Sequence, residues 1–437
     1  MRPLLLFVLP FLLGLLLRLG LVGLELPFWY DEVWTANFAA FRLSPEAALS
    51  RLVGEDSHPP LSYALYRLWA EALGLEDPLT HRDPGVERGL RILSALLGAG
   101  TSGLTALLAG ALGASWPAAL GAGLLYALAP AALMREAEVH VYPPAAFLAA
   151  LALLLWARGR YWGFALAAAL AFHAHYLALP LLLLLPALSF GAKGLLPYLL
   201  FLPWGLHAVP LQAAGLPDKS PFNGLPEKAL AQMAAFSHSP EPALVAVGAG
   251  LWLLGLLAAL HPKGRLPGLT LLLFLGLWLL LLPAATGFNA YSVRYVTLPL
   301  PLILATAALG LSLLPWRTAF LLLGVPLLAW SLALPLTTRD YLAFRSPSLL
   351  ALPLNLAPRK VTASSKPLGG VLKHVCRPCQ VSLWDGDPGS LREGYLVIGL
   401  NSLRIAAGEH PHLLPLLRER ARLLGEQGQI LLLWVRP

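Results

Sequence analysis

Long apolar stretches recur along most of the chain, and they constrain its fold more than any other feature. Apolar residues make up 57% of the 437 residues and charged residues only 12%, which is outside the range of soluble globular proteins. The first stretch, residues 3–24, is long enough to cross a bilayer. No small-residue cleavage site follows it, so we expect a retained helix and not a signal peptide. The chain is therefore predicted to be a polytopic α-helical membrane protein.

The apolar stretches predict about eleven transmembrane helices. They cover residues 3–24, 90–112, 116–133, 143–157, 161–176, 177–190, 195–210, 243–260, 268–286, 295–314 and 317–336. Some of them, such as 143–157 and the region from His173 to Pro180, fall short of the ~20 residues that a straight span needs. We expect half-helices or one broken helix there.

Basic residues in the short connections set the expected orientation. With the N-terminus inside, the inner connections carry Arg158, Arg160, Lys193, Lys263, Arg265 and Arg317, as the positive-inside rule favours. Arg135, on a short outer connection, counts against this orientation. We predict a multi-pass protein of the plasma (inner) membrane whose longest loops are extracytoplasmic. The net charge of +8 then favours membrane lipids or a lipid phosphate as partner, and not nucleic acid.

The first outer loop, residues 25–89, begins with the adjacent carboxylates Asp31 and Glu32. On a helix these neighbours point about 100° apart, so we expect them to do different jobs. Such a pair can act as a general base or hold a divalent cation such as Mg²⁺ or Mn²⁺, but it can also mark a solvated helix end. The loop also predicts two amphipathic helices that could lie on the membrane surface, at 46–53 and 60–74, the second with Leu61, Leu65, Leu68, Trp69 and Leu73 on its apolar face.

Two further polar clusters fall on the same side. Asp56 and His58 precede a double proline; Asp56 taken alone is typical of a helix cap, whereas His58 is placed to act as a ligand or hydrogen-bond donor. Glu136, Glu138 and His140 have a spacing compatible with a metal ion.

Single basic residues near the predicted helix ends leave two interpretations open. Arg294, beside Tyr295, can clamp a phosphate through paired hydrogen bonds or can snorkel at the interface. Arg18, within the first apolar stretch, is expected to snorkel, with a role facing a cavity as the alternative.

The composition changes near residue 337, which predicts a transmembrane domain at 1–336 and a small α/β domain outside the membrane at 337–437. The second domain contains strand-like runs at 381–384, 395–400 and 430–435 and a helical run at 411–426. Cys376 and Cys379 could be a redox pair, half of a metal site or a disulfide. An outside location favours the disulfide, because that compartment is oxidising.

Taken in order, the polar residues of the outer side resemble the opening of a known family. The pattern runs Tyr30-Asp31-Glu32-x-Trp34-Thr35, then Asp56-x-His58-Pro59-Pro60-Leu61 with Tyr63 and Trp69, then 88–96, then Glu138-x-His140-x-Tyr142. It is similar to the polyprenyl-phosphate-sugar-dependent glycosyltransferases of the GT-C superfamily. Within that superfamily it is most similar to bacterial mannosyltransferase-like enzymes related to protein O-mannosyltransferases and lipid A aminoarabinose transferases. The similarity is clearest over residues 28–160.

The resemblance implies that Asp31 is the catalytic base and that Glu32 helps to build the pocket. We place donor and acceptor binding at Asp56, His58, Arg135, Glu138, His140, Tyr142, His175 and Arg294. In the family the third motif usually reads Glu-x-Arg-x-Tyr, whereas this chain has His140 at the position of the Arg. Arg135 or Arg294 would then bind the donor phosphate.

The expected function is inverting transfer of a sugar from a polyprenyl-phosphate donor to a lipid, glycan or protein acceptor. A membrane transporter or lipid-linked-sugar flippase is the main alternative, and a scaffold whose outer domain binds glycan is a third. A transporter would place ionisable residues near the bilayer midplane on broken helices, often in repeated halves. Here they gather in loops on one side, and no repeat is visible.

Overall fold

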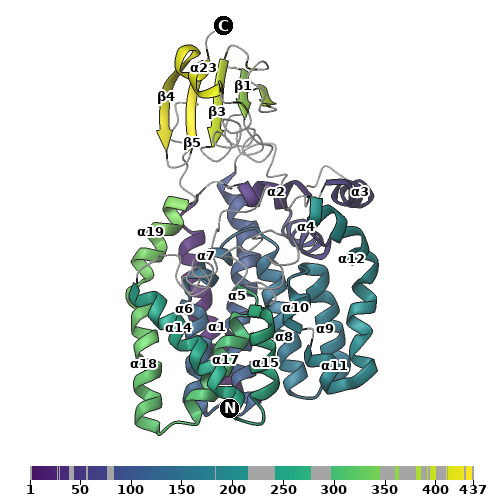
Figure 1. Ribbon diagram of the computed structural model, residues 1–437, viewed down its shortest axis with the longest axis vertical. Helices are drawn as coiled ribbons and strands as arrows, with labels where there is room; N and C mark the ends of the chain where they lie inside the picture. Colours follow the sequence, from purple (N-terminus) through teal and green to yellow (C-terminus); the bar gives the residue numbers. More distant parts are fainter. Residues whose placement is uncertain are drawn as a thin grey trace.

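The structure is a computed structural model with a helical body and a small sheet. It describes residues 2–26, 28, 30–38, 44–55, 58–75, 83–182, 184–214, 242–276, 297–344, 360–363, 380–384, 391, 394–399, 410, 412–427 and 430–435. The N-terminus lies at one end of the helical body, and the sheet lies beyond the opposite end (Figure 1). The predicted disulfide residues Cys376 and Cys379 lie outside the described ranges.

Apolar helices make up the body. The longer ones are α1 (Arg2–Val22), α5 (Pro84–Leu112), α6 (Trp116–Leu128), α8 (Tyr142–Ala157), α9 (Tyr161–Ala174), α12 (Leu196–Ala214), α14 (Pro242–Leu257), α15 (Arg265–Gly276), α17 (Leu300–Ser312) and α18 (Trp316–Leu332). The shorter pieces are α7 (Pro130–Arg135), α10 (Ala178–Leu182), α11 (Leu184–Phe190), η1 (Gly191–Leu195), η3 (Ala258–Leu260) and α19 (Leu334–Phe344).

Several predicted spans are divided or short. The apolar segment 116–133 forms α6 and α7, which separate at Ala129, because Pro130 has no N–H to donate to the turn before it. The expected break near His173 to Pro180 is present, since α9 ends at Ala174 and α10 begins at Ala178. Of the described helices, Pro3–Val22 and Pro84–Leu112 are long and apolar enough to cross a membrane by themselves. The number of spans stays a prediction.

Glycines allow the first helices to pack closely. At Gly103 of α5, an added Cβ would lie 2.5 Å from Cδ2 of Phe7 on α1. At Gly123 of α6, it would lie 2.7 Å from Cγ of Pro10. Small residues at helix contacts are typical of membrane proteins, in which close backbone approach drives helix association.

Large apolar side chains cover the outside of the body. On α1, α12 and α18 the exposed ones include Leu4, Leu9, Leu12, Leu16, Leu199, Leu202, Leu206, Phe320, Leu321, Val325, Leu328 and Leu332. Soluble monomers rarely expose so much contiguous apolar surface. The exposed belt indicates that lipid surrounds the helical body.

Three helices lie across the end of the body that faces the sheet: α2 (Tyr30–Phe38), α3 (Pro45–Glu55) and α4 (Leu61–Leu73) (Figure 1). The two helices predicted for this loop thus form. The buried face of α4 carries Ser62, Tyr63, Tyr66 and Ala70, while Leu68 and Leu73 of the predicted apolar face are exposed. Tyr66 and Ser62 are drawn inward by hydrogen bonds to the adjoining loops and helices.

The sheet has five strands in the order β2-β1-β3-β5-β4. They are β1 (Lys360–Ala363), β2 (Gln380–Leu383), β3 (Gly394–Gly399), β4 (Ala421–Gln427) and β5 (Ile430–Val435), with α23 (Leu413–Arg420) before β4. β1 pairs in parallel with β2 and β3, whereas β5 pairs antiparallel with β3 and β4. The three predicted strands are present, and β1 is an additional one.

The helix predicted at 411–426 was wrong in its second half. The helix ends at Arg420, and Ala421–Gln427 forms β4. Residues 421–427 pair with β5, and Leu423 lies opposite Leu433. This pairing outweighs the local preference for a helix, because the segment becomes the edge strand of the sheet.

The two faces of the sheet are covered by different elements. One face packs on α23. The other face forms one buried cluster with the outer helices, in which Val361, Ala363, Tyr395, Val397 and Leu432 join Phe28, Val33, Ala36, Tyr66, Val86, Leu90 and Val139. The sheet therefore rests on α2, the helix that carries Asp31 and Glu32.

Candidate active site

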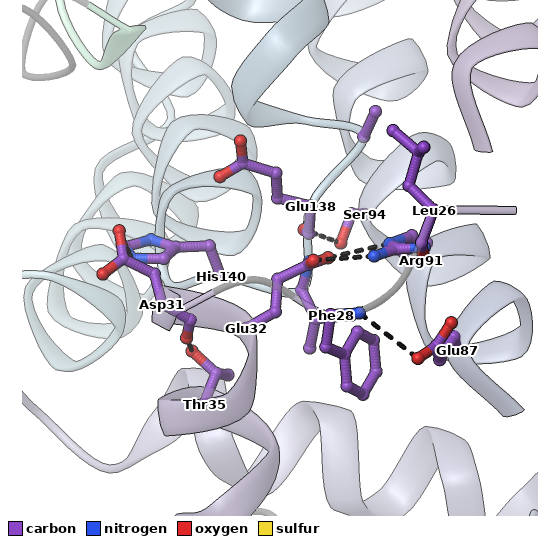
Figure 2. A network of polar contacts seen from close by, with 12 residues as sticks. Leu26, Phe28, Asp31, Glu32, Thr35, Glu87, Arg91, Ser94, Glu138 and His140 are labelled. Carbon is purple, nitrogen blue, oxygen red and sulfur yellow. Dashed lines mark hydrogen bonds and ion pairs between the residues drawn. The ribbon is translucent and has the colours of Figure 1, made fainter. Parts of the chain in front are cut away.

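Glu32 is fully buried and is held by Arg91 of α5 (Figure 2). Arg91 donates from Nε to Oε1 at 2.8 Å and from Nη2 to Oε2 at 2.7 Å. The amide of Val139 donates to Oε1 at 3.0 Å, and Nη1 of Arg91 donates to the carbonyl of Leu26 at 2.5 Å. Paired hydrogen bonds with additional partners offset the cost of burying two charges. Glu32 thus joins α2 to α5 and to the loop before α8.

Asp31 points away from this ion pair (Figure 2). Its Oδ2 lies 3.4 Å from Nε2 of His140, and its backbone carbonyl accepts a hydrogen bond from the Thr35 hydroxyl at 2.9 Å. The side chains of Asp31 and His140 are 11% and 9% exposed, whereas that of Glu32 is 0% exposed. The neighbouring carboxylates therefore diverge as helix geometry predicts, and Asp31 is the one that solvent can reach.

Tyr66 of α4 fastens the backbone at His140. Its hydroxyl donates to the His140 carbonyl at 2.9 Å and accepts from the His140 amide at 3.1 Å. Ser94 Oγ lies 2.7 Å from the same hydroxyl, and it donates to the Glu138 carbonyl at 2.5 Å. Burial raises the pKa of the Tyr66 hydroxyl above its ordinary value, so the hydroxyl stays protonated and the contact does not depend on pH in the neutral range.

Five aromatic rings adjoin one another from His140 to His58. The ring of His140 stacks on Tyr142, with centroids 4.7 Å apart, and Tyr142 stacks on His175 at 5.1 Å. His58 meets His175 edge-on at 5.2 Å and stacks on Tyr176 at 5.7 Å. Four predicted binding residues, His58, His140, Tyr142 and His175, are thus brought into one cluster from three separate parts of the chain.

Glu138 and Arg135 form a second buried pair next to Asp31 and His140. Nη1 of Arg135 lies 3.2 Å from Oε2 and 3.4 Å from Oε1 of Glu138. The carboxylate of Glu138 points away from the Glu32–Arg91 pair (Figure 2). These contacts are longer than those of Arg91, so this pair is held less tightly.

Glu136 is turned into the helical body. It accepts hydrogen bonds from Nε and Nη2 of Arg18 and, at 2.6 Å, from the hydroxyl of Tyr126. The expectation that Arg18 snorkels is wrong, because the side chain is fully buried against this carboxylate. Gly98 provides the space, since a Cβ there would lie 2.5 Å from both Arg18 Nε and Glu136 Oε2.

The predicted cation site of Glu136, Glu138 and His140 is not formed. Each of the three residues faces a different partner, respectively Arg18, Arg135 and Asp31. In the part of the chain that the structure describes, no group of three or more His, Cys, Asp or Glu side chains is arranged to hold a metal ion. A divalent cation stays a prediction.

Two predicted site residues, Asp56 and Arg294, lie outside the described ranges. Conversely, the structure adds Arg91, Tyr66 and Ser94 to the site. A buried Glu32 requires a counter-charge. Arg91 lies at the start of the apolar segment 90–112, and this position of a charged residue was the signal that could have identified it. Nothing comparable marks Tyr66 or Ser94, because hydroxyl groups occur in every environment.

The comparison with known proteins rests on structure. No family model and no curated protein matches the sequence. Two solved structures of ArnT from Cupriavidus metallidurans match, each over 97% of this chain and 97% of that chain. The apo state is 12% identical with a TM-score of 0.56, and the state bound to undecaprenyl phosphate is 13% identical with a TM-score of 0.52. The chain has an ArnT-like fold.

This match confirms the predicted architecture at the level of the fold, which is mostly helical and ArnT-like with a small C-terminal sheet. An identity of 12–13% carries no residue roles, so the chemistry has to be argued from the side chains.

Proposed function

We propose that the protein is an inverting glycosyltransferase that takes a sugar from a polyprenyl-phosphate donor at the outer face of the plasma membrane. The acceptor is a lipid, glycan or protein. The observation that carries the proposal is Asp31, a partly accessible carboxylate beside His140, on a helix that the Glu32–Arg91 pair holds in place. The ArnT-like fold supports it, since ArnT itself was solved with undecaprenyl phosphate.

The chemistry assigned to Asp31 is general base catalysis. Its carboxylate takes the proton of the acceptor hydroxyl as the acceptor oxygen forms a bond to the anomeric carbon. The bond between that carbon and the phosphate oxygen breaks, and the phosphate leaves with the electron pair. One displacement of this kind inverts the anomeric carbon.

The leaving phosphate needs charge stabilisation more than a proton. Arg18 and Arg91 are held by Glu136 and Glu32 inside the protein, so neither is assigned to the donor. We assign the phosphate to Arg135, whose contacts to Glu138 are longer, or to Arg294.

The distribution of buried charge favours a transferase over a transporter. The described buried charged and histidine residues are Arg18, Asp31, Glu32, Glu87, Arg91, Arg135, Glu136, Glu138, His140 and His175. Asp31 and Glu32 belong to α2, which lies at the end of the body next to the sheet (Figure 1), and Arg91 and His140 are in contact with them. A transporter typically carries such residues at the midplane. One-sided chemistry with a lipid-linked donor fits this arrangement.

The test is transfer from a synthetic polyprenyl-phosphate sugar by the full-length protein in lipid nanodiscs. Asp31→Asn preserves size but cannot accept a proton, so turnover with a hydroxyl acceptor should fall by about 10²–10⁴-fold while donor binding is retained. Glu71→Gln, which changes an exposed carboxylate on α4, is the matched control and should keep wild-type turnover. Full activity of Asp31→Asn would remove Asp31 from the mechanism, and no transfer by the wild type with a panel of donors would overturn the proposed function.

A further inference from the structure

The position of His140 differs from the pattern that the sequence otherwise resembles, because a histidine stands where an arginine is usual. The structure places its Nε2 3.4 Å from Oδ2 of Asp31. We propose that His140 is a positioning residue for Asp31, and that its neutral imidazole holds the carboxylate while reducing its basicity less than a cation would. This inference rests on the proposed function of Asp31 as the base.

The orientation of the imidazole is determined from several sides. Tyr66 binds both the amide and the carbonyl of His140, so the backbone cannot turn. Tyr142 lies against the ring with an interplanar angle of 9° and is backed in turn by His175. A ring held in this way can donate from Nε2 to Oδ2 of Asp31 and so fix the direction in which the carboxylate faces. Catalytic contacts of this length commonly shorten when substrate binds.

The charges around His140 make Asp31 its principal ionic neighbour. Glu32, which binds the adjacent Val139 amide, is neutralised by Arg91, and Glu138 is paired with Arg135. The ring of Tyr142 lies against the imidazole, and the ring of His175 lies against Tyr142.

This pairing has a consequence that an arginine would not have. A guanidinium is charged at every physiological pH, whereas an imidazole ordinarily changes its charge between about pH 5 and 8. A cation beside Asp31 stabilises the carboxylate and makes it a weaker base. Transfer should therefore decline on the acidic side of neutrality, as His140 becomes protonated.

The experiment compares pH profiles of kcat for the wild type, His140→Gln and His140→Arg in nanodiscs, with donor KM measured in parallel. We expect an acid limb in the wild type. Gln keeps a neutral donor, so His140→Gln should lower kcat about tenfold to a hundredfold at neutral pH. Donor KM should change little, and the part of the acid limb that is due to His140 should be lost. In His140→Arg the rate should be low throughout, because the neighbouring charge is permanent.

His261→Gln is the control, since this histidine belongs to the connection between η3 and α15 at the far end of the body, and its profile should match the wild type. Thermal unfolding verifies that each variant is folded. An unchanged acid limb in His140→Gln would overturn the positioning role. A raised donor KM at constant kcat would also overturn it and would place His140 on the donor phosphate. Complete loss of turnover in folded His140→Gln would make His140 the base itself. Failure of the proposed function is distinguishable, because it appears as no transfer by the wild type at any pH.

Discussion

The two sides of α2 differ in how deeply their carboxylates are buried and in how close the ionic partner of each lies. On one side, Glu32 receives three hydrogen bonds from Arg91 and the Val139 amide and is fully buried. On the other side, Asp31 and His140 are separated by 3.4 Å, and both retain some exposure. Glu32 and Asp31, adjacent on one helix, therefore differ in burial and in the distance to their ionic partners. The ion pair of Glu32 with Arg91 fixes α2 against α5. The carboxylate of Asp31 is partly accessible to solvent, so it can exchange a proton.

The sheet strengthens the same contrast. Val33 and Ala36 of α2 are buried in the cluster that the sheet forms with the outer helices. The sheet thus covers the apolar face of α2 and leaves Asp31 on another face. We interpret the C-terminal domain as a support for the helix that carries the base.

The largest effect on stability is expected from Glu32→Gln, which leaves Arg91 buried without its counter-charge. Removing one member of a buried ion pair typically costs about 3–5 kcal/mol, so the midpoint of thermal unfolding in detergent should drop sharply and little folded protein should be recovered. Asp31→Asn should unfold close to the wild type. Equal stability of the two variants would show that the sides of α2 do not differ as described.

A smaller loss is expected from Tyr66→Phe. This change removes the hydroxyl that binds the amide and carbonyl of His140 and lies beside Ser94, and an unsatisfied buried polar group costs about 1–3 kcal/mol. Because the imidazole is no longer held, transfer should also fall while donor KM is retained. Tyr198→Phe, which removes a hydroxyl of α12 that donates to the Leu182 carbonyl, is the comparison for loss of a hydroxyl on another helix, and a larger loss of turnover there would contradict the assignment.

The smallest effect is expected from the exposed pair on α4. Arg67 Nε donates to Glu71 Oε1 at 2.9 Å across one helical turn, but the Glu71 side chain is 49% exposed. Exposed pairs of this spacing contribute about 0.3–0.5 kcal/mol. Arg67→Gln should therefore shift the unfolding midpoint by no more than the scatter between preparations, and a drop like that of Glu32→Gln would mean that burial does not decide the value of these pairs.

The sequence predicted those helices and site residues that can be recognised from a short stretch of neighbouring residues. Apolar periodicity located most helices, and the clustering of polar residues in outer connections located Asp31, Glu32, His58, His140 and His175 at one end of the body. It did not locate β4, where pairing with β5 outweighs the helical preference of 421–426. It also assigned Glu136, Glu138 and His140 to one ion, although each faces a different element.

The sequence by itself determined that this chain has an apolar helical body and that its clusters of carboxylates and histidines fall in the connections of one side, because hydrophobicity and charge are properties of each residue. Only the tertiary structure decided which groups are neutralised. The partners Glu32 and Arg91 are 59 positions apart, and Arg18 and Glu136 are 118 apart, so no local pattern connects them. Whether a carboxylate is an anchor or a base depends on its distance from a counter-charge and on its access to solvent, and both quantities exist only once the helices are packed.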